Sequence, residues 1–185
     1  MGFMTAFNSP QLHLIGLLLL AGLAPLGAQS PATDHVGRDD VKLADLEAID
    51  LEGKSFDPAT LEGKVTVLDF WASWCSPCME AFPVLNELRA ELAGEGFEIV
   101  SVAMYSGPPD IVRQVVARFD LNYPVVLGND QTPVIYDVLG YPTYLLMDQD
   151  GNLVRRYVGD FNNPLARLRM DALALLSDKP LEALP

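Results

Sequence analysis

Cysteine and histidine are scarce in this sequence, which has two of each among 185 residues. A structural zinc site needs four nitrogen or sulfur ligands, and the two cysteines, Cys75 and Cys78, supply only half of them. The histidines do not complete the set, because His13 lies in an apolar leader and His35 in a polar segment. We therefore expect no metal at the cysteines and no bound cofactor elsewhere.

Positive charge is also sparse, with 12 Lys and Arg against 25 Asp and Glu and a net charge of -13. Such a balance disfavours binding to a phosphate backbone or to an anionic membrane, and it favours solubility. No nucleic-acid partner is expected. Half of the residues are hydrophobic, so the chain can bury one sizeable core after its leader.

Charge is absent altogether from residues 12–28, an apolar block that borders on the length needed to span a bilayer. The block is typical of an export signal, and Pro25 and Gly27 near its end fit a signal peptide better than a long membrane helix. No Lys or Arg precedes it, so an uncleaved membrane anchor stays open. In either case the cysteines are expected outside the cytoplasm, in the periplasm.

Composition divides the rest of the chain at two further points. After the leader comes a stretch of Gln, Ser, Pro, Thr, Gly and Asp with few apolar residues, typical of a flexible tether. The predicted organisation is a signal peptide or anchor at 1–28, a tether at 29–42, one domain at 43–178 and a C-terminal tail at 179–185.

The two cysteines follow directly on an apolar run and begin an amphipathic stretch. Residues 65–71 have the apolar character of a strand covered on both faces, and apolar residues then recur at helical spacing from residue 76. At the start of that helix, unpaired backbone N–H groups and the helix dipole favour a thiolate at Cys75. A thiolate attacks disulfides, and a second sulfur two residues on can close onto it. We therefore predict Cys75 as nucleophile and Cys78 as resolving residue.

Three other interpretations of the cysteine pair stay open. The pair could be half of a zinc site, or a structural disulfide that closes so small a loop that it stabilises the fold by only ~2 kcal/mol. It could also be two unreactive core thiols, although the helix start and the intervening Ser76 and Pro77 argue against burial of both cysteines. Redox activity is the favoured interpretation.

Strand and helix patterns alternate along the domain and end in a hairpin, which predicts an α/β fold with a central mixed sheet flanked by helices. An N-terminal hairpin is expected within residues 46–56. Strands are expected at 65–71, 97–104, 123–127, 143–147 and 153–158, and helices at 76–93, 109–119, 132–138 and 163–176.

Three segments carry a resemblance to a known family. Residues 69–78 read Asp-Phe-Trp-Ala-Ser-Trp-Cys-Ser-Pro-Cys, with Pro83 five residues further on, and this resembles the active-site segment of the thioredoxin superfamily. Residues 140–151 resemble the cis-proline loop, strand and turn of the extracytoplasmic TlpA/ResA-like branch. Residues 97–138 resemble the strand and helix inserted in that branch and in peroxiredoxins. The resemblance covers roughly residues 43–176 and implies a thioredoxin fold.

Asp69 is the unusual residue of its strand, because a carboxylate on an otherwise apolar strand must be protonated or paired. Burial is expected to raise its pKa and to let it shuttle a proton. A structural acid satisfied by a backbone donor is the alternative. By resemblance, Asp69 falls on the buried aspartate of thioredoxin, which helps to deprotonate the resolving thiol.

The resemblance also implies a substrate-binding surface. Pro142 would form a cis peptide bond and face the cysteines, and the backbone of Tyr141 would pair with an extended substrate segment. Trp74 is expected to cover the edge of the dithiol, with Ser76 and Pro77 as further substrate contacts. Tyr141 departs from the small aliphatic residue that is usual there.

The implied function is an extracytoplasmic thiol-disulfide oxidoreductase that reduces protein disulfides, for example during cytochrome c or oxidase assembly. The redox-active Cys75–Cys78 pair would take electrons from a membrane donor, and a monomer is expected. A disulfide-donating oxidant and a peroxide-linked reductase on the same fold stay open. From another class comes a non-catalytic binding protein with a structural disulfide.

Overall fold

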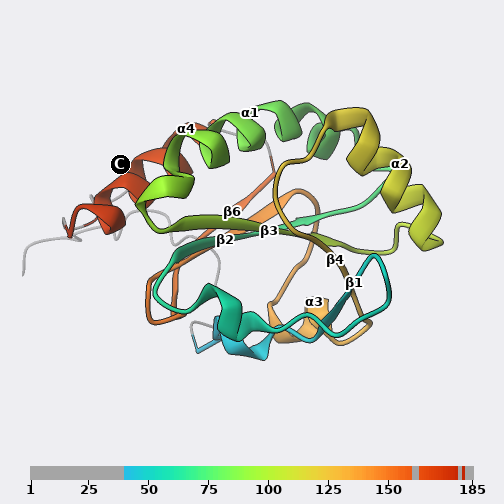
Figure 1. Ribbon diagram of the computed structural model, residues 1–185, viewed down its shortest axis with the longest axis horizontal. Coiled ribbons are helices and arrows are strands. Elements are labelled where there is room, and N and C mark those ends of the chain that lie inside the picture. The colour runs from blue at the N-terminus through green and yellow to red at the C-terminus, as the bar shows by residue number, and fades with distance from the viewer. Residues whose placement is uncertain (1–39, 160–162, 179–180, 182–185) are drawn as a thin grey trace, which may run out of the picture. The chain divides into compact units, whose positions relative to one another are not determined.

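The computed structural model describes residues 40–159, 163–178 and 181 (Figure 1). The predicted leader at 1–28, most of the predicted tether and most of the predicted tail therefore lie outside the described residues. Within the described part, no helix has both the length and the apolar character needed to cross a membrane.

Six strands and four α-helices make up the described part of the chain. The strands are β1 (Ala48–Asp50), β2 (Val65–Trp71), β3 (Phe97–Ala103), β4 (Val125–Gly128), β5 (Thr143–Met147) and β6 (Leu153–Val158). The helices are α1 (Ser76–Leu92), α2 (Pro109–Phe119), α3 (Thr132–Ile135) and α4 (Pro164–Leu176). Short 3₁₀ turns occupy Leu43–Asp45, Pro58–Leu61 and Ala93–Glu95.

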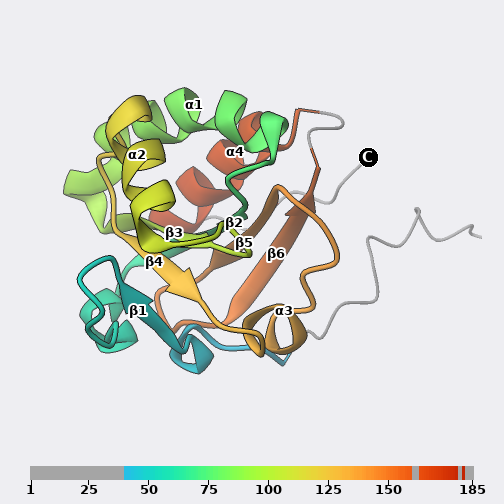
Figure 2. The ribbon, with the colours of Figure 1, turned by 90° about the vertical axis from the view of Figure 1, so that its right-hand side faces the viewer.

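The strands form one mixed sheet in the order β1-β4-β3-β2-β5-β6. Strands β2, β3 and β4 are parallel, whereas β1, β5 and β6 each run antiparallel to a neighbour. Helices α1, α2 and α4 cover one face, and α3 lies on the other face with the N-terminal turns (Figures 1 and 2). The predicted α/β fold with a central mixed sheet is confirmed.

The N-terminal hairpin is shorter than the sequence pattern suggests. Strand β1 forms its ladder with β4, where Ile49 faces Leu127. Its other edge makes only an isolated bridge from Ile49 to Ser55, after a turn in which Gly53 has a φ of 83°. The return arm is therefore one bridge, because the chain enters the 3₁₀ turn at Pro58 soon afterwards.

Strand β2 is buried along its whole length and separates two apolar clusters. Val65, Val67 and Trp71 belong to the cluster that also contains residues of α1, whereas Leu68 and Phe70 belong to the cluster on the opposite face. Since side chains alternate along a strand, Asp69 points to the α1 side, between Val67 and Trp71.

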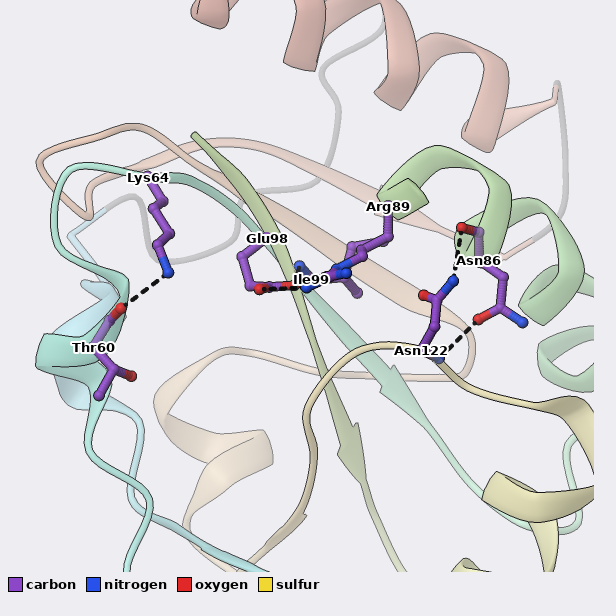
Figure 3. Close-up of polar contacts among 7 residues, drawn as sticks. All are labelled: Thr60, Lys64, Asn86, Arg89, Glu98, Ile99 and Asn122. Carbon is purple, nitrogen blue, oxygen red and sulfur yellow. Dashed lines mark hydrogen bonds and ion pairs between the residues drawn. The ribbon is translucent and has the colours of Figure 1, made fainter. Parts of the chain in front are cut away.

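Polar contacts along α1 fix the helix against its neighbours (Figure 3). The side-chain amide of Asn86 donates to the carbonyl of Phe119 at 2.9 Å, and the Asn122 backbone N–H donates back to Asn86 Oδ1 at 3.2 Å. Arg89 makes two hydrogen bonds to the Glu98 carboxylate, at 3.1 and 3.2 Å. These contacts tie the helix that begins at the cysteines to the end of α2 and to β3.

Candidate active site

The cysteines form a disulfide at the beginning of α1. Cys75 is the N-cap residue of the helix, and its sulfur is joined to that of Cys78 with a Cα–Cα distance of 5.3 Å. The Cys78 backbone N–H donates to Cys75 Sγ at 3.3 Å. In the reduced protein the same N–H group and the helix dipole would stabilise a thiolate on Cys75.

Both cysteines are buried, with 5% of Cys75 and 1% of Cys78 exposed, so the expectation that the two would not both be buried is wrong. The reason is packing, because both sulfurs join the cluster of Trp71 and Phe82, and Tyr141 packs against that cluster. Cys75 is nevertheless the more exposed of the two, which is in keeping with Cys75 as the attacking residue and Cys78 as the resolving residue.

Ser76 and Pro77 are exposed on the first turn of α1. The Ser76 hydroxyl lies 3.5 Å from Glu80 Oε1, a contact at the surface. Both residues are therefore open to a bound polypeptide, as their predicted role requires. That role stays a prediction.

A loop after β3 holds the segment that precedes Cys75. The Ser73 backbone N–H donates to Ser106 Oγ at 2.9 Å, and the Ser73 hydroxyl donates to the Ser106 carbonyl at 3.1 Å. The Trp74 indole N–H donates to the carbonyl of Tyr105 at 3.2 Å. Neither Ser106 nor Tyr105 was predicted as a site residue. Their position just after β3 is the feature of the sequence that could have indicated them. Neighbouring parallel strands end at the same edge of a sheet, so residues that follow β3 lie near those that follow β2.

The predicted cis peptide bond between Tyr141 and Pro142 is confirmed. It precedes β5, whose first residue, Thr143, faces Phe70 near the end of β2, so the loop lies at the same end of the sheet as the cysteines. The Tyr141 ring meets the Trp74 ring edge to face, with centroids 5.8 Å apart. Burial raises the pKa of Tyr141 to about 12, so its phenol stays neutral.

The two tryptophans differ sharply in exposure. Trp74 is 67% exposed beside the dithiol, which suits its predicted place at the edge of the site. Trp71 is fully buried and packs edge to face on Phe82, so it belongs to the core.

Asp69 is buried beneath α1, with 1% of its surface exposed. Its partner is the side chain of Ser101 on β3, whose hydroxyl donates to Asp69 Oδ2 at 2.9 Å. Burial raises the pKa of Asp69 from 3.8 to about 7, and the Ser101 hydrogen bond acts against that rise. The carboxyl can therefore take up and release a proton near neutral pH.

Fold and site together define a class: a thioredoxin-fold protein with a vicinal cysteine pair at a helix start, a cis-proline loop and a buried acid. Residues 27–173, more than half of the chain, match the Redoxin family. The chain belongs to that family and is a TlpA/ResA-like member of the thioredoxin superfamily.

The relatives include the thiol-disulfide oxidoreductase ResA of Geobacillus thermodenitrificans. It is 32% identical over 149 residues, which cover 77% of this chain and 84% of the relative. The ResA protein of a Bacillus cereus strain is 37% identical over 114 residues, covering 60% of this chain. The chain spans 64% of the length of that relative.

A solved structure shows the same fold at similar identity. The crystal structure of a DsbE-type thiol:disulfide interchange protein from Chlorobium tepidum superposes with a TM-score of 0.67 and 31% identity. The match covers 75% of this chain and 98% of that protein.

Proposed function

We propose that this protein is an extracytoplasmic thiol-disulfide oxidoreductase that reduces disulfides in other proteins. The observation that carries the proposal is the Cys75–Cys78 disulfide at the N-terminus of α1, in which Cys75 is the more exposed residue. The buried Asp69 and the cis-proline loop support it, as do the oxidoreductases among the relatives.

In the proposed reaction the Cys75 thiolate attacks one sulfur of a substrate disulfide, and the other sulfur leaves as a thiolate. A mixed disulfide then joins Cys75 to the substrate. Cys78 gives its proton to the Asp69 carboxylate and attacks Cys75, which releases the second substrate sulfur with the electron pair of the broken bond. The substrate gains two electrons, and the protein is left with its Cys75–Cys78 disulfide until a donor reduces it.

Insulin provides a direct test of this activity. The reduced wild-type protein is expected to reduce insulin disulfides, measured as precipitation of the freed B chain, and Cys75→Ser is expected to abolish the reaction. If neither the wild type nor the variant reduced insulin, a non-catalytic binding protein with a structural disulfide would be the better interpretation.

The direction of electron flow follows from how strongly the Cys75 thiolate is stabilised, because a very low thiol pKa favours the reduced form and makes an oxidant. Ser76 and Pro77 between the cysteines carry no positive charge, so the helix start is the main source of stabilisation. We expect a standard reduction potential at or below about -200 mV. It can be measured by equilibrating the protein with glutathione. A potential near about -120 mV would instead identify a disulfide-donating oxidant.

The cellular setting is part of the same proposal. The apolar block at residues 12–28 supports export, with the domain soluble after cleavage or tethered at the membrane. Cell fractionation should find the protein outside the cytoplasm, and a cytoplasmic full-length product with reduced cysteines would contradict this. A membrane electron donor, a monomeric state and clients from cytochrome c or oxidase assembly are proposed from the resemblance to the TlpA/ResA branch.

A further inference from the structure

Asp69 and Ser101 form a polar pair within the core beneath α1. They are direct neighbours in the parallel register of β2 and β3, and at most 1% of either residue is exposed. The Ser101 hydroxyl lies 2.9 Å from Asp69 Oδ2. Because both residues sit on rigid central strands, the pair holds the carboxyl in a fixed place.

Other titratable groups pack around this pair. Tyr144 of β5 is the register partner of Asp69 on the other side, and Tyr144 and Cys78 of α1 belong to one core cluster. Tyr123, which precedes β4, has a buried hydroxyl without a hydrogen-bond partner in the described part of the chain, and the charge of Asp69 raises its already high pKa further. Helix α4, which also contacts β2, carries Asp171, and the carboxylate of Asp171 accepts from Tyr157 and Arg155.

A hydroxyl is chemically suited to a carboxyl that changes its charge. It donates to an ionised carboxylate, and after rotation it accepts from a protonated acid, whereas an ammonium group could only donate. Ser101 is therefore able to keep a hydrogen bond to Asp69 before and after proton transfer.

We propose that Ser101 is a positioning residue for the proton-transfer step, because its hydroxyl fixes the Asp69 carboxyl beneath α1 and partners it in both protonation states. This inference rests on the proposed function, since it concerns the step in which Cys78 loses its proton. Ser101 acts on that step only through Asp69. Without its hydroxyl, the effect of burial would be unopposed by this hydrogen bond, and the carboxyl would ionise only at higher pH.

The test follows both steps of the reaction with one probe. Reduced protein releases one thionitrobenzoate from dithiobis(nitrobenzoate) when Cys75 attacks and a second when Cys78 resolves the mixed disulfide. Stopped-flow traces over a pH series give the midpoint of the second phase, and a carbon-13 label in the aspartates gives the Asp69 titration by NMR. Ser101→Ala is expected to move both midpoints upward by on the order of one pH unit. Below both midpoints, the second phase should slow on the order of tenfold.

Two controls separate positioning from a general effect on the core. Tyr123→Phe also removes a buried hydroxyl beside Asp69, but one without a hydrogen-bond partner among the described residues, so it should keep the wild-type midpoints. In an Asp69→Asn background, Ser101→Ala should have no further effect on the pH profile.

Three results would overturn the inference. They are an unchanged Asp69 titration in Ser101→Ala, a moved titration without a moved kinetic midpoint, and the same slowing in the Asp69→Asn background. A wild type that releases no second thionitrobenzoate would overturn the proposed function as well. Reduction of insulin by a protein with unmoved midpoints would leave that function standing.

Discussion

Replacing Cys78 with serine is expected to reduce turnover to the uncatalysed background while the first attack by Cys75 persists. The chain has two cysteines, so no other thiol can resolve the mixed disulfide. The substrate should therefore stay attached to Cys75 and accumulate as a stable adduct. Non-reducing electrophoresis and mass spectrometry of the adduct measure this directly, and in cell extracts the attached proteins would identify the clients.

Cys75→Ser is the matched control for this experiment. It also leaves one cysteine, but that cysteine is the less exposed Cys78, so few or no adducts are expected. Adducts through Cys78 in Cys75→Ser at the level seen through Cys75 in Cys78→Ser would reverse the two roles. Sustained insulin reduction by Cys78→Ser would show that an external thiol resolves the intermediate.

Much of the fold follows from local pattern. The predicted strands at 65–71, 143–147 and 153–158 and the predicted helix at 109–119 have the observed bounds, and Gly, Pro, Asn or Asp residues mark most of these ends. The prediction was less accurate where tertiary pairing sets the limits. Strand β4 begins only at Val125, after a proline that cannot donate to the ladder, and β1 pairs with β4 rather than with a full return strand.

The residues of the candidate site also differ in whether they can be predicted from local sequence. The cysteine pair, Asp69 and the cis bond before Pro142 are visible from residue types and motif. Ser101 is not, because its contact with Asp69 depends on the register of two strands 32 residues apart. The burial of both cysteines was also missed, since it results from a core cluster whose residues come from distant segments of the chain.

Asp69 should make the stability of the fold depend on pH. Its ordinary pKa is 3.8, whereas burial raises the pKa in the folded state to about 7. Between these values the folded state holds a proton that the unfolded state has lost, so stability falls as pH rises through this window. This rise in the pKa of Asp69 corresponds to roughly 4 kcal/mol of unfolding free energy. That stability is present at low pH and is lost above about pH 7. Asp69→Asn should flatten the dependence measured by urea unfolding and be the more stable protein at alkaline pH.

The same variant should slow the resolving step, because an amide cannot accept the proton of Cys78. In the wild type the second phase of thionitrobenzoate release is expected to rise with pH through about 7, as Asp69 ionises. In Asp69→Asn the second phase should lose that rise, and its rate should follow the ionisation of the Cys78 thiol itself, near or above about pH 8.5.

At neutral pH the second phase of Asp69→Asn should slow on the order of a hundredfold. The first phase should slow much less, because the Cys75 thiolate is stabilised by the helix start. If Asp69→Asn resolved the mixed disulfide at the wild-type rate, Asp69 would have no part in the proton transfer from Cys78. Slower resolution together with higher stability would show that the core tolerates a destabilising buried acid because Cys78 needs a base.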